Sequence, residues 1–259
     1  MRTLFAGILM AACTMAHAQI QTQKIEYHAP DGTVLHGYHA FDDSIQGPRP
    51  GVLVVHEWWG LNEYAQKRAR DLAALGYSAL AIDMYGEGKV AEHPKDAQAF
   101  MQAALSNADA AKERFMAGYA ALQQQDQTEP NKMAAVGYCF GGKVVLDMAR
   151  QRVPLAAVVS FHGALGTNTP ATAGSVAAKV LVANGELDSM ISEAQIQAFH
   201  AEMKQANADY TFINLPDAKH GFTNPDADRH QAQGLDLAYN PKADEVSWAK
   251  MKALLDEVF

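Results

Sequence analysis

The sequence has only two cysteines, Cys13 and Cys139, in 259 residues, and its acidic side chains outnumber the basic ones. The resulting formal charge of −8 at pH 7 argues against a nucleic-acid partner, because proteins that bind phosphate backbones carry clustered positive charge. The histidines and cysteines also lack the paired spacing of a zinc site. We therefore expect no nucleic-acid partner, no metal and no cofactor.

The sequence also has no apolar run long enough to cross a membrane as a helix, which needs about 20 residues. A shorter apolar stretch follows Arg2 and precedes the small-residue pattern Ala16-His17-Ala18, an arrangement typical of a cleavable signal peptide. We predict a signal peptide over residues 1–18 and a periplasmic or secreted protein that begins at Gln19. A lipoprotein with its lipid on Cys13 is the alternative.

Removal of residues 1–18 would leave Cys139 as the single cysteine and would change the formal charge from −8 to −9, because Arg2 is the only charged side chain lost. No internal disulfide could then form. An unpaired cysteine in an oxidising compartment indicates either deep burial or a chemical use. Residues 19–259 contain no internal repeat and no linker, so we predict a single domain, and we expect a monomer.

Short apolar runs alternate with longer stretches of helical periodicity in most of the chain. The predicted strands cover residues 51–56, 78–84, 132–138, 156–161, 179–183 and 210–215. The predicted helices cover residues 62–75, 94–125, 142–150, 192–207 and 244–258. Before them, alternating polar and apolar residues at 24–41 predict an antiparallel hairpin. This rhythm is typical of an α/β fold with a mostly parallel central sheet and helices on both faces.

Two stretches without periodicity, residues 85–95 and 223–242, follow predicted strands. Ligands of parallel sheets bind beyond the carboxyl ends of the strands. These stretches are therefore candidates for the wall or the lid of a binding site, although ordinary surface loops would have the same composition.

A cysteine follows one predicted strand in a glycine-rich turn, with the sequence Gly137-Tyr138-Cys139-Phe140-Gly141-Gly142. The turn has the strand, nucleophile and helix order of the G-x-S-x-G elbow, with cysteine in place of serine. Glycines two residues before and after the nucleophile let strand and helix pass closely. The positive end of the helix should favour the thiolate. We predict Cys139 as a nucleophile, and a buried structural cysteine is the alternative.

A cysteine nucleophile gains from an adjacent imidazole that a carboxylate orients. In enzymes with this elbow the acid follows the nucleophile in the chain and the histidine follows the acid. Asp188 and His220 have this order, and each lies just past a predicted strand. Glu186 is the competing acid. His162 precedes the acid in the chain, so we assign it to the pocket wall and predict a triad of Cys139, Asp188 and His220.

A second motif, Val55-His56-Glu57-Trp58-Trp59-Gly60, follows the first long buried strand. Enzymes with this elbow place one oxyanion-binding N–H group there, and the residue after the nucleophile supplies the other. We predict the backbones of Trp58 and Phe140 as these donors. A charged Glu57 at the end of a buried strand is costly unless it is paired. It could form a structural ion pair, or it could contact the thiol or its histidine.

Several aromatic residues lie near the predicted strand ends and could form a neutral pocket, although core packing would explain any one of them. These residues are Trp58, Trp59, Tyr85, Tyr138 and Phe161.

From about residue 24 to the C-terminus the chain resembles the dienelactone hydrolase family. The resemblance is carried by His56-Glu57-Trp58-Trp59-Gly60, Asp83-Met84-Tyr85, Gly137-Tyr138-Cys139-Phe140-Gly141-Gly142, Gly185-Glu186-Leu187-Asp188 and His220-Gly221-Phe222. It implies an α/β-hydrolase fold with Cys139 as nucleophile and Asp188 and His220 as its triad partners. It further implies that Glu57 contacts the resting thiol and takes part in its activation.

The chain departs from dienelactone-cleaving members at two positions. Those members have an arginine two residues after the position of Tyr85 and another four residues after the catalytic histidine, and both hold the substrate carboxylate. Here the positions hold Glu87 and Asn224, and Lys89 or Arg229 could fold in as substitutes. We therefore predict neutral substrates.

Together these features predict a hydrolase that cleaves small carboxylic esters or lactones through an acyl-thioester intermediate. A non-catalytic thiol protein on the same scaffold, serving in redox sensing or ligand binding, is one alternative. A peptidase or an acyltransferase with the same triad is another.

Overall fold

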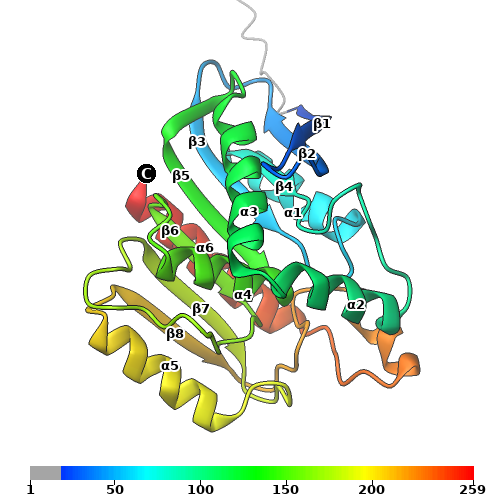
Figure 1. Ribbon diagram of the computed structural model, residues 1–259, viewed down its shortest axis with the longest axis vertical. Coiled ribbons are helices and arrows are strands. Elements are labelled where there is room, and N and C mark those ends of the chain that lie inside the picture. The colour runs from blue at the N-terminus through cyan, green and yellow to red at the C-terminus, as the bar shows by residue number, and fades with distance from the viewer. Residues whose placement is uncertain (1–18) are drawn as a thin grey trace, which may run out of the picture.

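The computed structural model describes residues 19–259, and its core is an eight-stranded sheet with the spatial order β1-β2-β4-β3-β5-β6-β7-β8 (Figure 1). The strands are β1 (Ile20–His28), β2 (Val34–Asp42), β3 (Arg49–Val55), β4 (Ser78–Ile82), β5 (Thr128–Tyr138), β6 (Ala157–Phe161), β7 (Lys179–Gly185) and β8 (Tyr210–Leu215). Strands β3 to β8 pair in parallel, whereas β1 and β2 form an antiparallel hairpin and β2 pairs antiparallel with β4. The predicted mostly parallel sheet and its N-terminal hairpin are confirmed.

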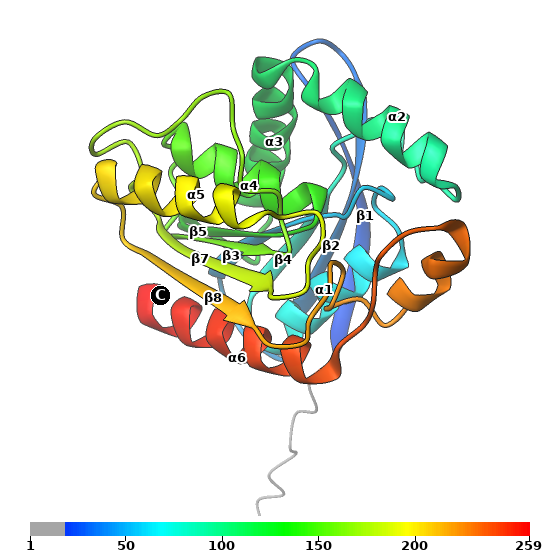
Figure 2. The ribbon, with the colours of Figure 1, turned by 90° about the horizontal axis from the view of Figure 1, so that it is seen from below.

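Helices cover both faces of the sheet, as Figure 2 shows. The helices are α1 (Glu63–Ala74), α2 (Pro94–Leu105), α3 (Ala108–Gln123), α4 (Phe140–Arg150), α5 (Glu193–Gln205) and α6 (Pro241–Val258). One apolar layer joins the sheet to α3, α4 and α5, and the other joins it to α1 and α6. Neighbouring residues of β3, Leu53 and Val54, are both fully buried and belong to opposite layers. This explains why the parallel strands are continuously apolar rather than alternating.

The structure corrects two element predictions. The helix predicted over residues 94–125 is two helices, because Asn107 accepts hydrogen bonds from the backbone N–H groups of Asp109 and Ala110 and so starts α3 anew. The stretch predicted as a loop over residues 223–242 contains a short 3-10 helix, Ala227–Gln233.

The predicted signal peptide, residues 1–18, and with it Cys13, lies outside the described residues. From residue 19 onward, no helix combines the length and the apolar character that crossing a membrane requires.

Candidate active site

Cys139 lies on a sharp turn between β5 and α4, at the carboxyl edge of the sheet. Its backbone has a φ of 54°, a conformation that is strained for a residue with a side chain. A Cβ atom on Gly137 would lie 2.1 Å from the carbonyl oxygen of Gly141, and one on Gly141 would lie 2.2 Å from the carbonyl oxygen of Val55. The two glycines therefore allow strand and helix to approach closely, as the elbow requires.

His220 and Asp188 approach this turn from the loops after β8 and β7. Nδ1 of His220 lies 2.8 Å from Oδ2 of Asp188, and both residues are buried. The other carboxylate oxygen of Asp188 accepts a hydrogen bond from the backbone N–H of Met190. Glu186, the competing acid, is exposed. The structure thus brings Asp188, and not Glu186, to the histidine.

The charge state of His220 depends on its two anionic neighbours. Burial alone would lower the pKa of the imidazole, but the Cys139 sulfur and the Asp188 carboxylate raise it to about 10. Nε2 of His220 is buried and forms no hydrogen bond to a nitrogen or oxygen atom of the residues described. Its neighbour is the Cys139 sulfur, which raises the pKa of the ring. This raised pKa favours the imidazolium form of His220.

Glu57 is buried, and it lies close enough to His220 for the two charges to interact. Its Oε2 accepts a hydrogen bond of 2.7 Å from Nδ2 of Asn224. The amide oxygen of Asn224 accepts from the backbone N–H of Asp226, which fixes the amide with its NH₂ group toward Glu57. Burial raises the pKa of Glu57 to about 7, while Asn224, His220 and Arg68 act in the opposite direction.

The loop after β3 brings Trp58 to the nucleophile and is held from three sides. The Tyr85 hydroxyl donates to the carbonyl oxygen of Trp58 at 2.9 Å. His56 accepts from the backbone N–H of Met84 at Nε2, so its Nδ1 donates to the carbonyl oxygen of Glu57. The backbone N–H of Gly141 donates to the carbonyl oxygen of His56, joining this loop to the start of α4.

Phe140 is the first residue of α4, where backbone N–H groups have no acceptor within the helix. Trp58 and Phe140 both line the cavity at Cys139. The structure thus places both residues that the sequence predicts as oxyanion donors at the cavity that contains Cys139.

The other predicted pocket residues pack around the site rather than line it. The rings of Tyr138 and Phe161 stack 4.8 Å apart in the core, and Trp59 stacks on His230. His162 is fully buried, its Nε2 lies 2.8 Å from Oγ1 of Thr223, and its ring meets the ring of His220 edge-on at 5.1 Å. Burial lowers the pKa of His162, which keeps it neutral beside the imidazolium of His220.

The cavity at Cys139 has a volume of about 200 Å³ and a mainly apolar lining. It is formed by Trp58, Met101, Leu105, Cys139, Phe140, Lys143, Ala164, Met190, Ile191, His220 and Leu237. Sequence reasoning missed the aliphatic members of this set, because single apolar residues from separate helices and loops carry no local motif. Nζ of Lys143 donates hydrogen bonds to Oδ2 of Asp147 at 2.8 Å and to the carbonyl oxygen of Gly166 at 2.9 Å.

The cations that could replace the missing arginines face solvent. Lys89 pairs with Glu87 at 3.0 Å, and both side chains are largely exposed. The Arg229 side chain is 74% exposed and pairs with Asp226. Neither cation lines the cavity at Cys139.

The elbow, the parallel sheet and the facing imidazole define an α/β hydrolase. The family model of the dienelactone hydrolase family matches residues 35–259, and the chain belongs to this family. Its members cleave lactones and esters, so the protein is a hydrolase of this class with a small-molecule substrate.

Two relatives illustrate the similarity. A protein of Escherichia coli O157:H7 named as a carboxymethylenebutenolidase is 26% identical over 239 residues, which cover 84% of this chain and 86% of that protein. The crystal structure of a dienelactone hydrolase-like promiscuous phosphotriesterase from metagenomic libraries is 34% identical. The match covers 94% of this chain and 100% of the chain in that crystal structure, with a TM-score of 0.87.

Proposed function

We propose that the protein is a carboxylic-ester hydrolase in which the thiolate of Cys139 is the nucleophile, His220 the general acid and base, and Asp188 the carboxylate that orients His220. The observation that carries the proposal is the strained elbow of Cys139, with His220 beside it and Asp188 2.8 Å from the histidine. Strain of this kind persists only where the surrounding structure enforces it, and it is common at catalytic residues.

In the proposed reaction the thiolate attacks the ester carbonyl, and the backbone N–H groups of Trp58 and Phe140 stabilise the oxyanion. His220 then protonates the departing alcohol, which leaves an acyl-thioester on Cys139. A water molecule gives a proton to neutral His220 and attacks the thioester. Collapse of the second tetrahedral intermediate releases the carboxylic acid and returns the thiolate and the imidazolium.

Glu57 is proposed to take part in activating the thiol. A buried carboxylate with a pKa of about 7 can accept a proton near neutral pH. The fixed NH₂ group of Asn224 favours the ionised form of Glu57, because it can only donate to that oxygen.

This role predicts a bell-shaped pH profile. Glu57 becomes ionised as the pH rises through about 7, so kcat/KM should increase there, and it should fall again near 10 as His220 loses its proton. In Glu57→Gln the acid limb near neutrality should disappear while the alkaline limb stays. An unchanged acid limb in this variant, measured with p-nitrophenyl acetate, would show that Glu57 does not control activation.

The mainly apolar lining of the cavity at Cys139 supports neutral substrates. A carboxylate there would lose its hydration without meeting a free cation, because Lys143 is already paired. We expect neutral short-chain or aromatic esters and lactones to have a higher kcat/KM than the anionic dienelactone. This expectation is tested by measuring kcat/KM for a panel of esters and lactones. The panel contains the dienelactone, its methyl ester and a neutral phosphotriester. Preference for the free dienelactone over its methyl ester would contradict it.

We also propose export, with removal of residues 1–18 and a monomeric mature chain. The mass of the protein recovered from the periplasm or the medium should correspond to a chain beginning near Gln19, with one free thiol and no disulfide. A protein that still carries Met1, or that has lipid on Cys13, would exclude this processing.

A further inference from the structure

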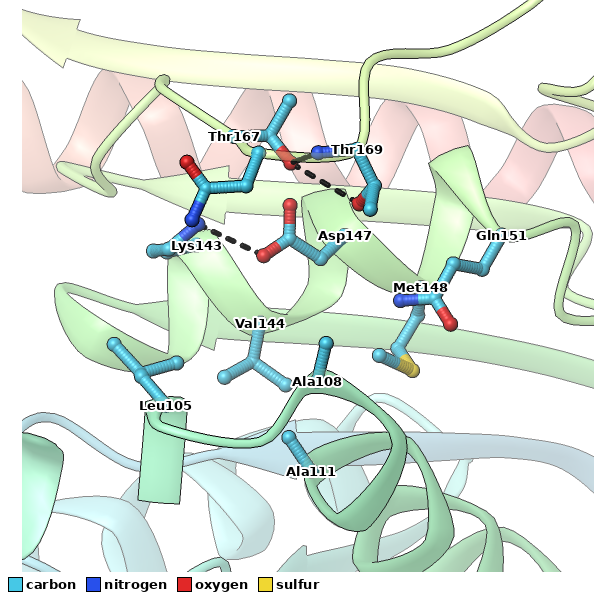
Figure 3. A pocket seen from close by; sticks show the side chains of 11 residues that line it. Leu105, Ala108, Ala111, Lys143, Val144, Asp147, Met148, Gln151, Thr167 and Thr169 are labelled. Carbon is cyan, nitrogen blue, oxygen red and sulfur yellow. Dashed lines mark hydrogen bonds and ion pairs between the residues drawn. The ribbon is translucent and has the colours of Figure 1, made fainter. Parts of the chain in front are cut away.

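A second cavity of about 90 Å³ opens beside the catalytic one, on the face of α4 that points toward α3 (Figure 3). Its apolar side is formed by Ala108, Ala111 and Val144. Its polar side is formed by Asp147, Gln151 and Thr169. We call this second cavity the distal cleft.

The distal cleft adjoins the catalytic cavity. Leu105 and Lys143 line both spaces. The loop after β6 also contributes to both, with Ala164 at the catalytic cavity and Thr167 at the distal cleft. The same three elements, the end of α2, helix α4 and this loop, therefore border both spaces, and we call the path along them from Cys139 the track.

The two parts of the track differ in chemistry. The catalytic part is mainly apolar, whereas the distal cleft offers hydroxyl and amide groups. Thr169 is exposed, and its hydroxyl has only a long contact of 3.4 Å with the hydroxyl of Thr167. Figure 3 shows both threonines on the loop that lies beside helix α4. These hydroxyls can still bond a ligand.

The charges at the distal cleft are already compensated. Asp147 accepts from Lys143 at 2.8 Å and from Arg150 at 3.0 Å, and Arg150 also pairs with Glu202 at 2.8 Å. An ionic ligand would have to compete with these pairs, whereas a neutral hydrogen-bonding group would not. The distal cleft therefore suits an uncharged polar group.

The length of the track sets the length of its occupant. Asp147 lies eight residues after Cys139 along α4, which corresponds to about 12 Å at ~1.5 Å per residue. An extended chain advances about 3.5 Å for every three bonds, so roughly ten bonds are needed to reach the distal cleft from the thiolate.

We propose that the distal cleft binds the far end of an elongated, uncharged ester, whose apolar chain of about ten bonds ends in a hydroxyl or a similar neutral hydrogen-bonding group. This inference rests on the proposed esterase function and specifies its substrate class.

The test compares p-nitrophenyl decanoate with its ω-hydroxy derivative, in wild type and in variants of the distal cleft. The hydroxyl should raise kcat/KM by about fivefold, mainly through KM, which is the effect of one net hydrogen bond. Thr169→Val, which removes the hydroxyl, and Ala108→Phe, which fills the distal cleft, should both abolish this advantage. Ala103→Phe, on an exposed position of α2 that lines neither space, is the matched control and should keep it.

All three variants should hydrolyse p-nitrophenyl acetate like wild type, because an acetyl group does not reach the distal cleft. Absence of acetate turnover in wild type would contradict the proposed function. Calorimetric binding of the two decanoyl esters to Cys139→Ala tests the distal cleft without turnover. If the hydroxyl gives no advantage in either assay, or if the advantage survives both Thr169→Val and Ala108→Phe, the proposal is wrong.

Discussion

Replacing Cys139 by alanine should reduce ester hydrolysis by about 10⁴-fold or more, because the acyl-enzyme can no longer form and only transition-state binding by the rest of the site remains. Release of p-nitrophenol from the acetate ester measures this loss. Alanine occupies less space than cysteine in a turn that its neighbours already hold in place, so the fold should persist. Circular dichroism and the melting temperature of the variant check that it does.

Cys139→Ser is the conservative partner of this substitution. It keeps the shape of the side chain but should still lose much of the rate, because a serine alkoxide is far harder to generate than a thiolate at neutral pH. Retention of wild-type turnover in Cys139→Ala would mean that another group carries out the hydrolysis. The assignment of Cys139 as the nucleophile would then be wrong.

The second large effect is expected for Asp188→Asn, with a loss of about 10⁴-fold in kcat. The substituted amide can present its NH₂ group to Nδ1 of His220, which turns the ring to the tautomer whose proton is on Nε2. Such a histidine can no longer accept a proton from the thiol. Loss of the Asp188 charge should also lower the pKa of His220, since this carboxylate helps to raise it.

Glu186→Gln is the matched control for this prediction. Glu186 belongs to the same loop and carries the same charge, but its side chain is exposed. The Glu186→Gln variant should therefore hydrolyse the ester as fast as wild type. The double variant Cys139→Ala and Asp188→Asn should be no slower than Cys139→Ala alone, because residues that act as a unit do not lose activity additively. Equal losses in Asp188→Asn and Glu186→Gln would point to the net charge of the loop instead of an oriented carboxylate.

The sequence determined the fold class and the family. Continuous apolar runs separated by helical periodicity predicted the parallel sheet, and the glycines around Cys139 predicted the elbow, because both depend on residues that are close in the chain. The structure and the family match confirm these two inferences. The catalytic roles of Cys139, Asp188 and His220, the export of the protein and its monomeric state remain predictions.

Which side chains meet depends on how the chain folds. The tertiary structure brought Asp188 rather than Glu186 to His220, although the two acids are two residues apart in one loop. It also paired Asn224 with Glu57 across 167 residues, at a position where the sequence comparison indicated only a missing arginine. It also directed the Tyr85 hydroxyl to the backbone carbonyl of Trp58.

The physical reason is the difference between local and long-range determinants. Periodicity, glycine turns and caps depend on backbone torsion angles and near neighbours, so the order of residues specifies them directly. Contacts between distant segments depend on strand register and on the paths of loops, and a shift of one residue in a strand turns its side chains to the opposite face. The sequence could therefore place Cys139, Asp188 and His220 at one edge of the sheet. The partner of Glu57 and the lining of the catalytic cavity were decided by the packing of the folded chain.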